Sequence, residues 1–280
     1  MRVGWMPLLC LALAGDGPRA VAQDAPGVGF GRLPGEGEPQ PFFAELESDP
    51  PVLVSLLPVA PRVPPRVKVA LAAARTRDAL AGELAGRGLV FGDPVFVRIF
   101  KEEEQLEVWV RRRETGRYEL FRVWRVAAWG GALGPKLAEG DGQSPEGFYS
   151  VPRARLQPNT HNHLAFNIGY PNAYDRALGR TGSAILVHGN DVSVGCFAMT
   201  DGRIEEIYTL CAAALKNGQA FFRVHCFPFR MTAGRMARTA GEPWEAFWGN
   251  LKEGYDWFEA EKVPPDVTVE NRRYAFKPGS

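Results

Sequence analysis

The sequence has little net charge, few histidines and few cysteines. Its 280 residues include 33 lysines and arginines against 32 aspartates and glutamates, so the formal net charge is +1. Nucleic acids are bound through a basic field, and this balance gives no reason to expect such a partner. The length and the ordinary hydrophobic content of 45% suit one substantial domain with extensions. The composition therefore favours a neutral or mixed partner.

Long apolar runs are also missing, and the nearest approach to one lies at the N-terminus. A basic start at Arg2 is followed by the short apolar block Trp5–Ala14 and by an A-x-A site at Ala20–Ala22. This order is typical of a secretory signal peptide, and the block is too short to span a membrane as a helix. We therefore expect residues 1–22 to be removed on export to the periplasm, and we expect no stable membrane span afterwards.

Loss of the signal would also remove Cys10 and leave three cysteines, Cys196, Cys211 and Cys226. An odd number of cysteines in an exported protein indicates at least one free thiol. Cys211 falls on the apolar stripe of a predicted helix, and Cys226 lies near the end of a strand-like run. Both are expected to be buried as small hydrophobic side chains, with a disulfide between them as the open alternative.

Composition and hydrophobic period divide the remaining chain into four parts. Residues 23–65 are rich in proline and glycine and read as a linker. Residues 66–90 predict an amphipathic helix that packs on the core, over Val67–Leu89. Residues 91–230 are expected to form the main domain, and residues 231–280 a helical extension and tail.

Within the main domain, β-branched and aromatic runs separated by polar turns predict strands. Three successive runs, at 95–100, 106–110 and 118–126, indicate an antiparallel meander. Further elements follow from the same reasoning. They are a strand at 163–172, a polar loop at 175–182, a strand at 184–187, a helix at 204–216 and a strand at 221–227, then helical segments at 232–240, 244–251 and 255–261 and an extended tail from residue 264.

The most informative stretch joins His188 to Cys196. The apolar run Ala184–Val187 delivers His188, and Cys196 follows eight residues later, just before a predicted helix start. A thiolate is favoured near a helix N-terminus, where unpaired N–H groups and the helix dipole stabilise negative charge. A nearby histidine can take the thiol proton. The stretch therefore predicts a nucleophilic cysteine with its base.

The residues between them fit the same chemistry. Gly189 and Gly195 allow sharp backbone turns beside both side chains. The backbone at Val194–Phe197 can offer N–H groups to an oxyanion, and Ser193 can orient the histidine or the substrate. On residue types alone, a buried cysteine at a helix start and a strand-end histidine with a structural role stay open as the alternative.

This stretch resembles the active-site motif of the L,D-transpeptidase catalytic (YkuD) domain family. The family's H-G and S-x-G-C elements correspond to His188-Gly189 and Ser193–Cys196. The sequence is similar above all to the YafK-like branch of exported murein enzymes, and the likeness spans roughly residues 65 to 260. The shared elements are H-G-x-x-V-S-x-G-C-[FY]-A-M-T-D at 188–201, I-E-E-I-Y at 204–208, F-N-I-G-Y-P-N at 166–172 and S-P-E-G-F-Y at 144–149.

The resemblance implies a mixed, mainly β fold: an L,D-transpeptidase-like β-sandwich core with an N-terminal helix and a C-terminal helical extension. It implies that Cys196 attacks the carbonyl at the L-centre of diaminopimelate in a peptidoglycan stem peptide, with His188 as base and then acid. The thioester then passes to an amine in transpeptidation, or to water in hydrolysis. The same resemblance places Asn167, Tyr170 and Asn172 in the substrate groove, and turn chemistry at a strand end is their structural alternative.

Two positions depart from the main family pattern. The family usually has a histidine before the glycine of S-H-G-C and an arginine two residues after the cysteine, where this sequence has Val194 and Ala198. The missing arginine removes a positive contact near the thiol, so the choice of acceptor does not carry over.

Two other functions stay open as alternatives to transfer. One is a murein amidase or L,D-endopeptidase that hydrolyses peptide or lipoprotein links to diaminopimelate, with murein-attached lipoprotein as a further partner. The second is a non-catalytic murein-binding module, against which the intact Cys196 and His188 argue. The cysteine mechanism needs neither a metal nor an organic cofactor. A zinc site from His188, Cys196, His225 and Cys226 is the inorganic alternative, and it lacks any paired cysteine or histidine motif.

Overall fold

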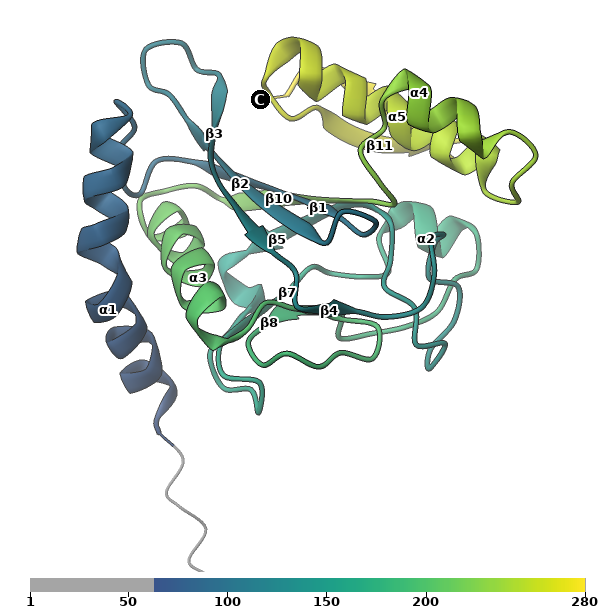
Figure 1. Ribbon diagram of the computed structural model, residues 1–280. Helices are drawn as coiled ribbons and strands as arrows, with labels where there is room; N and C mark the ends of the chain where they lie inside the picture. The colour runs from purple at the N-terminus through teal and green to yellow at the C-terminus, as the bar shows by residue number, and fades with distance from the viewer. Residues whose placement is uncertain (1–62, 280) are drawn as a thin grey trace, which may run out of the picture. The chain divides into compact units, whose positions relative to one another are not determined.

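The computed structural model describes residues 63–279. The predicted signal peptide at 1–22 and all but the last three residues of the predicted linker lie outside the described residues. Two five-stranded sheets form the centre of the described part, with helices packed around them (Figure 1). The predicted mixed, mainly β fold with an N-terminal helix and a C-terminal helical extension is therefore confirmed. In the described part, no helix combines the length and the apolar character that crossing a membrane requires.

The first sheet has the strand order β3-β2-β1-β10-β5. β1 pairs antiparallel with β2, and β2 pairs antiparallel with β3, so the predicted meander is confirmed. β10 lies parallel to β1 on its other side and pairs antiparallel with β5. All six residues of β1 are buried, because both faces of this central strand are covered. The strands are β1 (Val95–Phe100), β2 (Gln105–Arg111), β3 (Tyr118–Arg125), β5 (Gly147–Pro152) and β10 (Phe221–Phe227).

The second sheet has the strand order β4-β9-β8-β7-β6, and each of its strands is only two or three residues long. β8 and β9 pair in parallel, and the other pairs are antiparallel. Its short strands alternate with long connections, and these loops carry the residues singled out by the sequence. The strands are β4 (Ala128–Trp129), β6 (Leu156–Gln157), which follows the short 3-10 helix η1 (Arg153–Arg155), β7 (Ala165–Asn167), β8 (Leu186–His188) and β9 (Phe197–Ala198).

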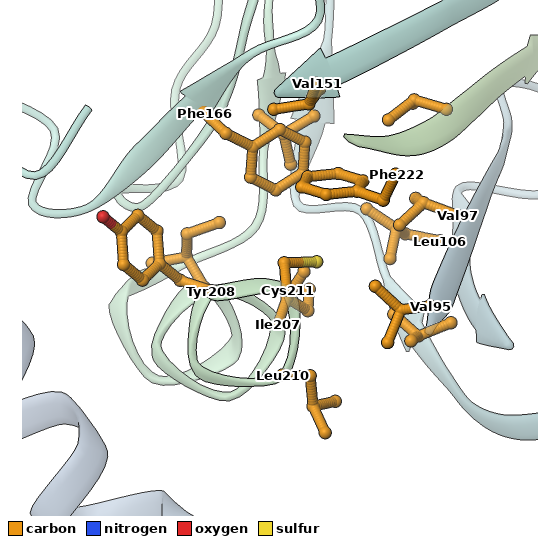
Figure 2. Packing of buried hydrophobic residues seen from close by; sticks show 14 of the residues in the cluster. Val95, Val97, Leu106, Val151, Phe166, Ile207, Tyr208, Leu210, Cys211 and Phe222 are labelled. Carbon is orange, nitrogen blue, oxygen red and sulfur yellow. The ribbon is translucent and has the colours of Figure 1, made fainter. Parts of the chain in front are cut away.

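The main hydrophobic core lies between the sheets and two helices, α1 (Pro65–Gly86) and α3 (Asp201–Lys216). The helix predicted over 67–89 is α1, and the helix predicted over 204–216 is α3, which begins three residues earlier. Figure 2 shows Cys211 pointing from α3 into this core, where Phe222 from β10 also lies. Cys211 and Cys226 are both free and fully buried, so they act as apolar core residues and the alternative of a disulfide is wrong.

The C-terminal extension covers the opposite face of the first sheet (Figure 1). Its α5 (Glu245–Glu261) is one continuous helix, which corrects the prediction of two helices at 244–251 and 255–261. Helix α4 (Ala233–Met236) and the 3-10 helix η2 (Ala237–Thr239) precede it. The prediction of an extended tail from residue 264 is also corrected, because β11 (Asp266–Glu270) and β12 (Arg273–Lys277) form an antiparallel hairpin.

The strand predicted at 163–172 is wrong in its length, because β7 covers only Ala165–Asn167, and a short helix, α2 (Ala173–Ala177), extends into the polar loop predicted at 175–182. Asn172 caps it: its side chain accepts a hydrogen bond from the Asp175 N–H, and the Asp175 carboxylate accepts one from the Asn172 N–H. This reciprocal capping box satisfies donors at the helix N-terminus. It explains why five residues without an apolar stripe are helical.

Candidate active site

Strand pairing brings the chain segments that carry His188 and Cys196 together. β8 and β9 are parallel, with Val187 opposite Phe197 and His188 opposite Ala198. His188 is the last residue of β8, and Cys196 directly precedes β9. The Cys196 thiol also contacts the backbone of Ala184 and Leu186, on the chain that leads to His188. The two predicted catalytic residues therefore belong to neighbouring segments of the second sheet.

The His188 ring is buried and held by its own neighbour. Its Nδ1 lies 2.5 Å from the Gly189 carbonyl oxygen. A carbonyl only accepts, so Nδ1 carries the proton and Nε2 keeps its lone pair. Burial lowers the pKa of His188, and the bond to Gly189 opposes part of that effect. His188 is therefore a neutral imidazole with a free basic nitrogen, which is the state that a general base requires.

The Cys196 thiol is half-buried and rests on backbone groups at the first residue of β8 and just before it. Its Sγ accepts a hydrogen bond from the Leu186 N–H at 3.3 Å and donates to the Ala184 carbonyl at 3.6 Å. Burial raises the pKa of this thiol, while the Leu186 N–H and the Lys136 ammonium act to lower it. A thiol whose pKa is raised needs a base to become a nucleophile, and His188 is the candidate for that role.

One predicted feature of the site is wrong. Cys196 does not adjoin a helix start, because β9 follows it and α3 begins only at Asp201, five residues later. The Asp201 carboxylate accepts from the Asn190 N–H, so the start of α3 is tied to the loop after His188 and not to the thiol. The helix dipole is therefore not the source of thiolate stabilisation here.

The two glycines of the motif serve different structural needs. A Cβ at Gly189 would lie 2.5 Å from the Asp201 carboxylate and 2.9 Å from the Asn162 carbonyl oxygen, so only glycine fits between them. Gly195 has a φ of +89°, a conformation that side chains disfavour. Both positions therefore require glycine for the geometry around the reacting side chains.

Three backbone N–H groups that precede Cys196 are available as hydrogen-bond donors. Within residues 63–279, no acceptor takes a hydrogen bond from the N–H groups of Ser193, Val194 or Gly195. The Ser193 hydroxyl is buried and likewise has no partner among the described residues. These groups can donate to the oxyanion that forms when the thiolate attacks a carbonyl. The orienting role of Ser193 stays a prediction.

Ser144 contacts the backbone of Cys196, and the sequence did not reveal this contact. Its buried hydroxyl donates to the Cys196 carbonyl oxygen at 3.0 Å and accepts from the Gly130 N–H at 2.9 Å. A Cβ at Gly130 would lie 2.4 Å from the Gly195 nitrogen, so the two loops touch through their backbones. Ser144 therefore fixes the cysteine's backbone to a neighbouring loop. Its only sequence signal was its membership of the S-P-E-G-F-Y element.

A buried ion pair supports the Ser144 loop from behind. The Lys101 ammonium donates to the Glu146 carboxylate at 2.9 Å and to the Ser144 carbonyl at 3.0 Å, and both charged side chains are 0% exposed. Trp248 of α5 donates to the other oxygen of Glu146 at 2.8 Å. The C-terminal extension is therefore connected through two residues to the segment that holds Cys196.

The three predicted groove residues have structural contacts of their own. The Asn167 side chain accepts from the Gly169 N–H within a turn, and the buried Tyr170 hydroxyl donates to the Lys136 carbonyl. Asn172 donates to the Phe148 carbonyl as well as capping α2. These contacts match the turn chemistry that the sequence left open. A role in binding substrate stays a prediction for all three.

Two of the remaining histidines have contacts away from the thiol. His163 Nε2 lies 2.7 Å from the Glu205 carboxylate of α3. His225 is buried in β10 of the other sheet, with its ring edge-on to Phe96 and Phe148. Neither contact involves Cys196, and both fit a structural role. Across residues 63–279, no group of three or more metal-binding side chains comes together.

Comparison with known proteins gives a consistent family. The L,D-transpeptidase catalytic domain (YkuD) family matches residues 94–225. YafK, a candidate L,D-transpeptidase of Escherichia coli, is 45% identical over 185 residues, which cover 66% of this chain and 74% of YafK. The same figures hold for the strains K12 and O157:H7.

Similar solved structures include the helical cell shape determining protein Pgp2 of Campylobacter jejuni and Bd1075 of Bdellovibrio bacteriovorus. Both are 17% identical to this chain, with TM-scores of 0.39 and 0.36. The alignment covers 69% of this chain and 80% of Pgp2, and 64% of this chain and 78% of Bd1075. The identity to YafK over most of its length, together with the family match over the catalytic motif, shows that this chain belongs to the L,D-transpeptidase catalytic domain family.

Proposed function

We propose that this protein is an exported cysteine acyl transferase that acts on peptidoglycan stem peptides. The observation that supports the proposal is the parallel pairing of β8, which ends at His188, with β9, which begins directly after Cys196, together with an imidazole whose Nδ1 is already bonded. Membership of the L,D-transpeptidase family supports peptidoglycan as the substrate class. The free Nε2 of His188 is the natural acceptor for the thiol proton.

The reaction follows from these groups. His188 Nε2 takes the proton of the Cys196 thiol, and the thiolate attacks the amide carbonyl at the L-centre of a diaminopimelate residue. The N–H groups of Ser193–Gly195 donate to the oxyanion of the tetrahedral intermediate. The C–N bond breaks, the imidazolium gives its proton to the leaving amine, and a thioester to Cys196 forms. His188 then deprotonates the acceptor, which attacks the thioester and releases the thiol.

The acceptor is either an amine or water. An amine gives a new cross-link, and water gives hydrolysis of a peptide link or of a link to murein-attached lipoprotein. The position two residues after the cysteine is the buried Ala198, and Val194 in the motif is 87% exposed. No charged side chain therefore stands at either position to hold an acceptor. The products decide between the two outcomes.

The test uses isolated sacculi and analysis of their muropeptides by mass spectrometry. The processed protein is expected to change the muropeptide pattern, and the Cys196→Ala variant is expected to leave it unchanged. New L,D cross-links mean transfer, whereas released peptides mean hydrolysis. Cys211→Ala is the matched control, because it removes a buried core thiol without touching the site.

Two further measurements complete the test. Exposure to a carbapenem is expected to add the mass of the drug to the peptide that contains Cys196. A pattern of products that does not depend on Cys196, or retained binding to sacculi with no product at all, refutes the enzyme proposal and favours a binding module. Export is tested separately, by fractionation and by N-terminal sequencing of the periplasmic protein, which is expected to begin after Ala22.

A further inference from the structure

Lys136 is a buried cation in the loop between β4 and β5. Its side chain is only 5% exposed. The ammonium donates to the Ala138 carbonyl at 2.8 Å and to the Asp141 carboxylate at 2.5 Å. The Tyr170 ring lies 5.9 Å from Nζ, and the Tyr170 hydroxyl donates to the lysine's own carbonyl. Burial of a cation costs free energy, so we expect this ammonium to have a role other than solubility.

Two chain segments connect the surroundings of this ammonium with those of the thiol. A Cβ at Gly182 would lie 2.8 Å from Lys136 Cε, so the lysine stem passes directly over Gly182. The Cys196 thiol contacts Ala184 and Leu186 of the same segment, and a single residue separates Ala184 from Gly182. Consecutive residues advance the chain by at most about 3.6 Å each, so the lysine stem and the thiol lie over backbone points that are at most about 7 Å apart.

The second segment approaches from the other side. A Cβ at Gly195, the residue before the cysteine, would lie 3.4 Å from the Gln143 carbonyl oxygen and 3.5 Å from the Gly142 carbonyl carbon. Asp141, the partner of the Lys136 ammonium, is the residue next to Gly142. The ammonium is therefore enclosed by loops that also enclose the thiol.

The charge of Asp141 does not fully cancel the effect of the Lys136 charge on the thiol. Asp141 accepts three backbone hydrogen bonds, from Leu137, Ala138 and Gln143, besides the bond from Lys136. Burial opposes its ionisation, but these donors outweigh burial and lower the pKa of Asp141 to about 2. Much of its negative charge is therefore compensated by N–H dipoles, and the ammonium keeps a net positive field toward the thiol.

The other two groups near the thiol are neutral in the resting state. Burial raises the pKa of Tyr170, so the phenol stays protonated. Burial lowers the pKa of His188, so the imidazole stays uncharged until it takes the thiol proton. Lys136 is therefore the positive charge that acts on Cys196 before catalysis begins, and its field lowers the pKa of the thiol.

We propose that Lys136 is a positioning residue whose buried ammonium stabilises the Cys196 thiolate from outside the motif at 188–201. The inference rests on the proposed role of Cys196 as nucleophile. The step concerned is transfer of the thiol proton to His188 Nε2, which leaves a thiolate whose negative charge the ammonium offsets. Asp141 holds the ammonium in place, and its own backbone donors keep it from neutralising the lysine.

The test measures thiolate formation without any peptidoglycan. Alkylation of Cys196 by iodoacetamide is followed across pH at fixed ionic strength, with peptide mass mapping to separate Cys196 from the two buried thiols. In Lys136→Met, the apparent pKa of alkylation is expected to rise by about one unit, so alkylation below that pKa slows about tenfold. Lys136→Arg is expected to keep most of the wild-type profile. Lys216→Met is the matched control, an exposed lysine at the far end of α3.

Removal of one partner of a buried pair can unfold a loop, so a second variant is needed. Lys136→Met with Asp141→Asn leaves no unpaired carboxylate, and thermal melting reports whether each variant folds. A raised alkylation pKa in the folded double variant supports the proposal. A wild-type profile in either folded variant overturns it, and so does a change confined to KM for murein. Inactivity of the wild-type protein on sacculi, with the pKa shift present, refutes only the proposed reaction.

Discussion

The buried pair of Lys101 and Glu146 gives the sharpest prediction about stability. Replacement of Glu146 by glutamine keeps the shape and removes the charge. Glu146 Oε1 accepts from Lys101 and from the Gly134 N–H at 2.6 Å, while Oε2 accepts from Trp248. An amide has one oxygen, so at least one of these buried donors must lose its acceptor. Breaking such a pair typically costs about 3–5 kcal/mol, and we expect Glu146→Gln to lower the unfolding free energy by that amount.

The pH dependence of stability provides a second test of the Glu146→Gln prediction. Burial lowers the pKa of Lys101, and Glu146 opposes that effect. Without the Glu146 carboxylate, burial lowers the pKa of Lys101 further. A lysine whose folded pKa lies below its unfolded value of about 10.5 binds fewer protons when folded, so stability falls as pH drops below that value. The Glu146→Gln variant is therefore expected to gain stability between pH 7 and pH 10, by more than the wild-type protein does.

Urea unfolding followed by circular dichroism measures both effects through the midpoint and the m-value. The double variant Lys101→Met with Glu146→Gln removes the unpaired charge, so its loss is expected to be smaller than the sum of the two single losses. A Glu146→Gln variant within about 1 kcal/mol of wild type refutes the reasoning, and so does a double variant whose loss equals the sum.

Three further predictions concern the site and the core. Ser144→Ala removes the hydroxyl that bridges Cys196 and Gly130, and it is expected to cost about 1–3 kcal/mol in urea unfolding and to slow alkylation of Cys196. Gly195→Ala places a side chain at a φ of +89° and is expected to lower the unfolding free energy by about 1–3 kcal/mol. Gly202→Ala, inside α3 with open space around it, is expected to be neutral or slightly stabilising. Equal losses of unfolding free energy in the two variants would contradict the backbone argument. Burial holds the pKa of His225 well below its usual value, so the folded state resists protonation and stability is lost as pH falls below about 6.5. Between pH 7.5 and pH 5 this residue is expected to cost at most about 2 kcal/mol, and His225→Leu is expected to flatten the pH dependence of the melting temperature.

Elements with a long, regular pattern were predictable from the sequence. β10 has the predicted bounds, and β1, β2, β3 and the two long helices of the core agree to within a few residues. All five strands of the second sheet have only two or three residues, too few for a period of two to appear. The C-terminal hairpin did carry a signal, the alternating run on either side of Asn271 and Arg272, whose positive φ values form its turn.

The residues of the candidate site also differ in whether the sequence could predict them. Cys196 and His188 are eight residues apart on one loop, so a local pattern could show them. Ser144 and Lys136 come from loops that are distant in the sequence, and no local pattern predicts their contacts with the surroundings of Cys196. The helix-start argument failed because a two-residue strand lies between the cysteine and α3. Contacts of this kind follow from topology, which a single sequence does not reveal.

The aromatic layer beneath α5 determines how short an independently folding fragment can be. Phe100, Phe148 and Phe227 of the first sheet pack against Tyr255 and Tyr274 of the extension. The match to the family ends at residue 225, before this layer is complete. A fragment cut there would expose large aromatic rings to water and promote aggregation. The matched region is thus shorter than the folding unit, and we expect recombinant versions to need the chain through β12 to stay soluble.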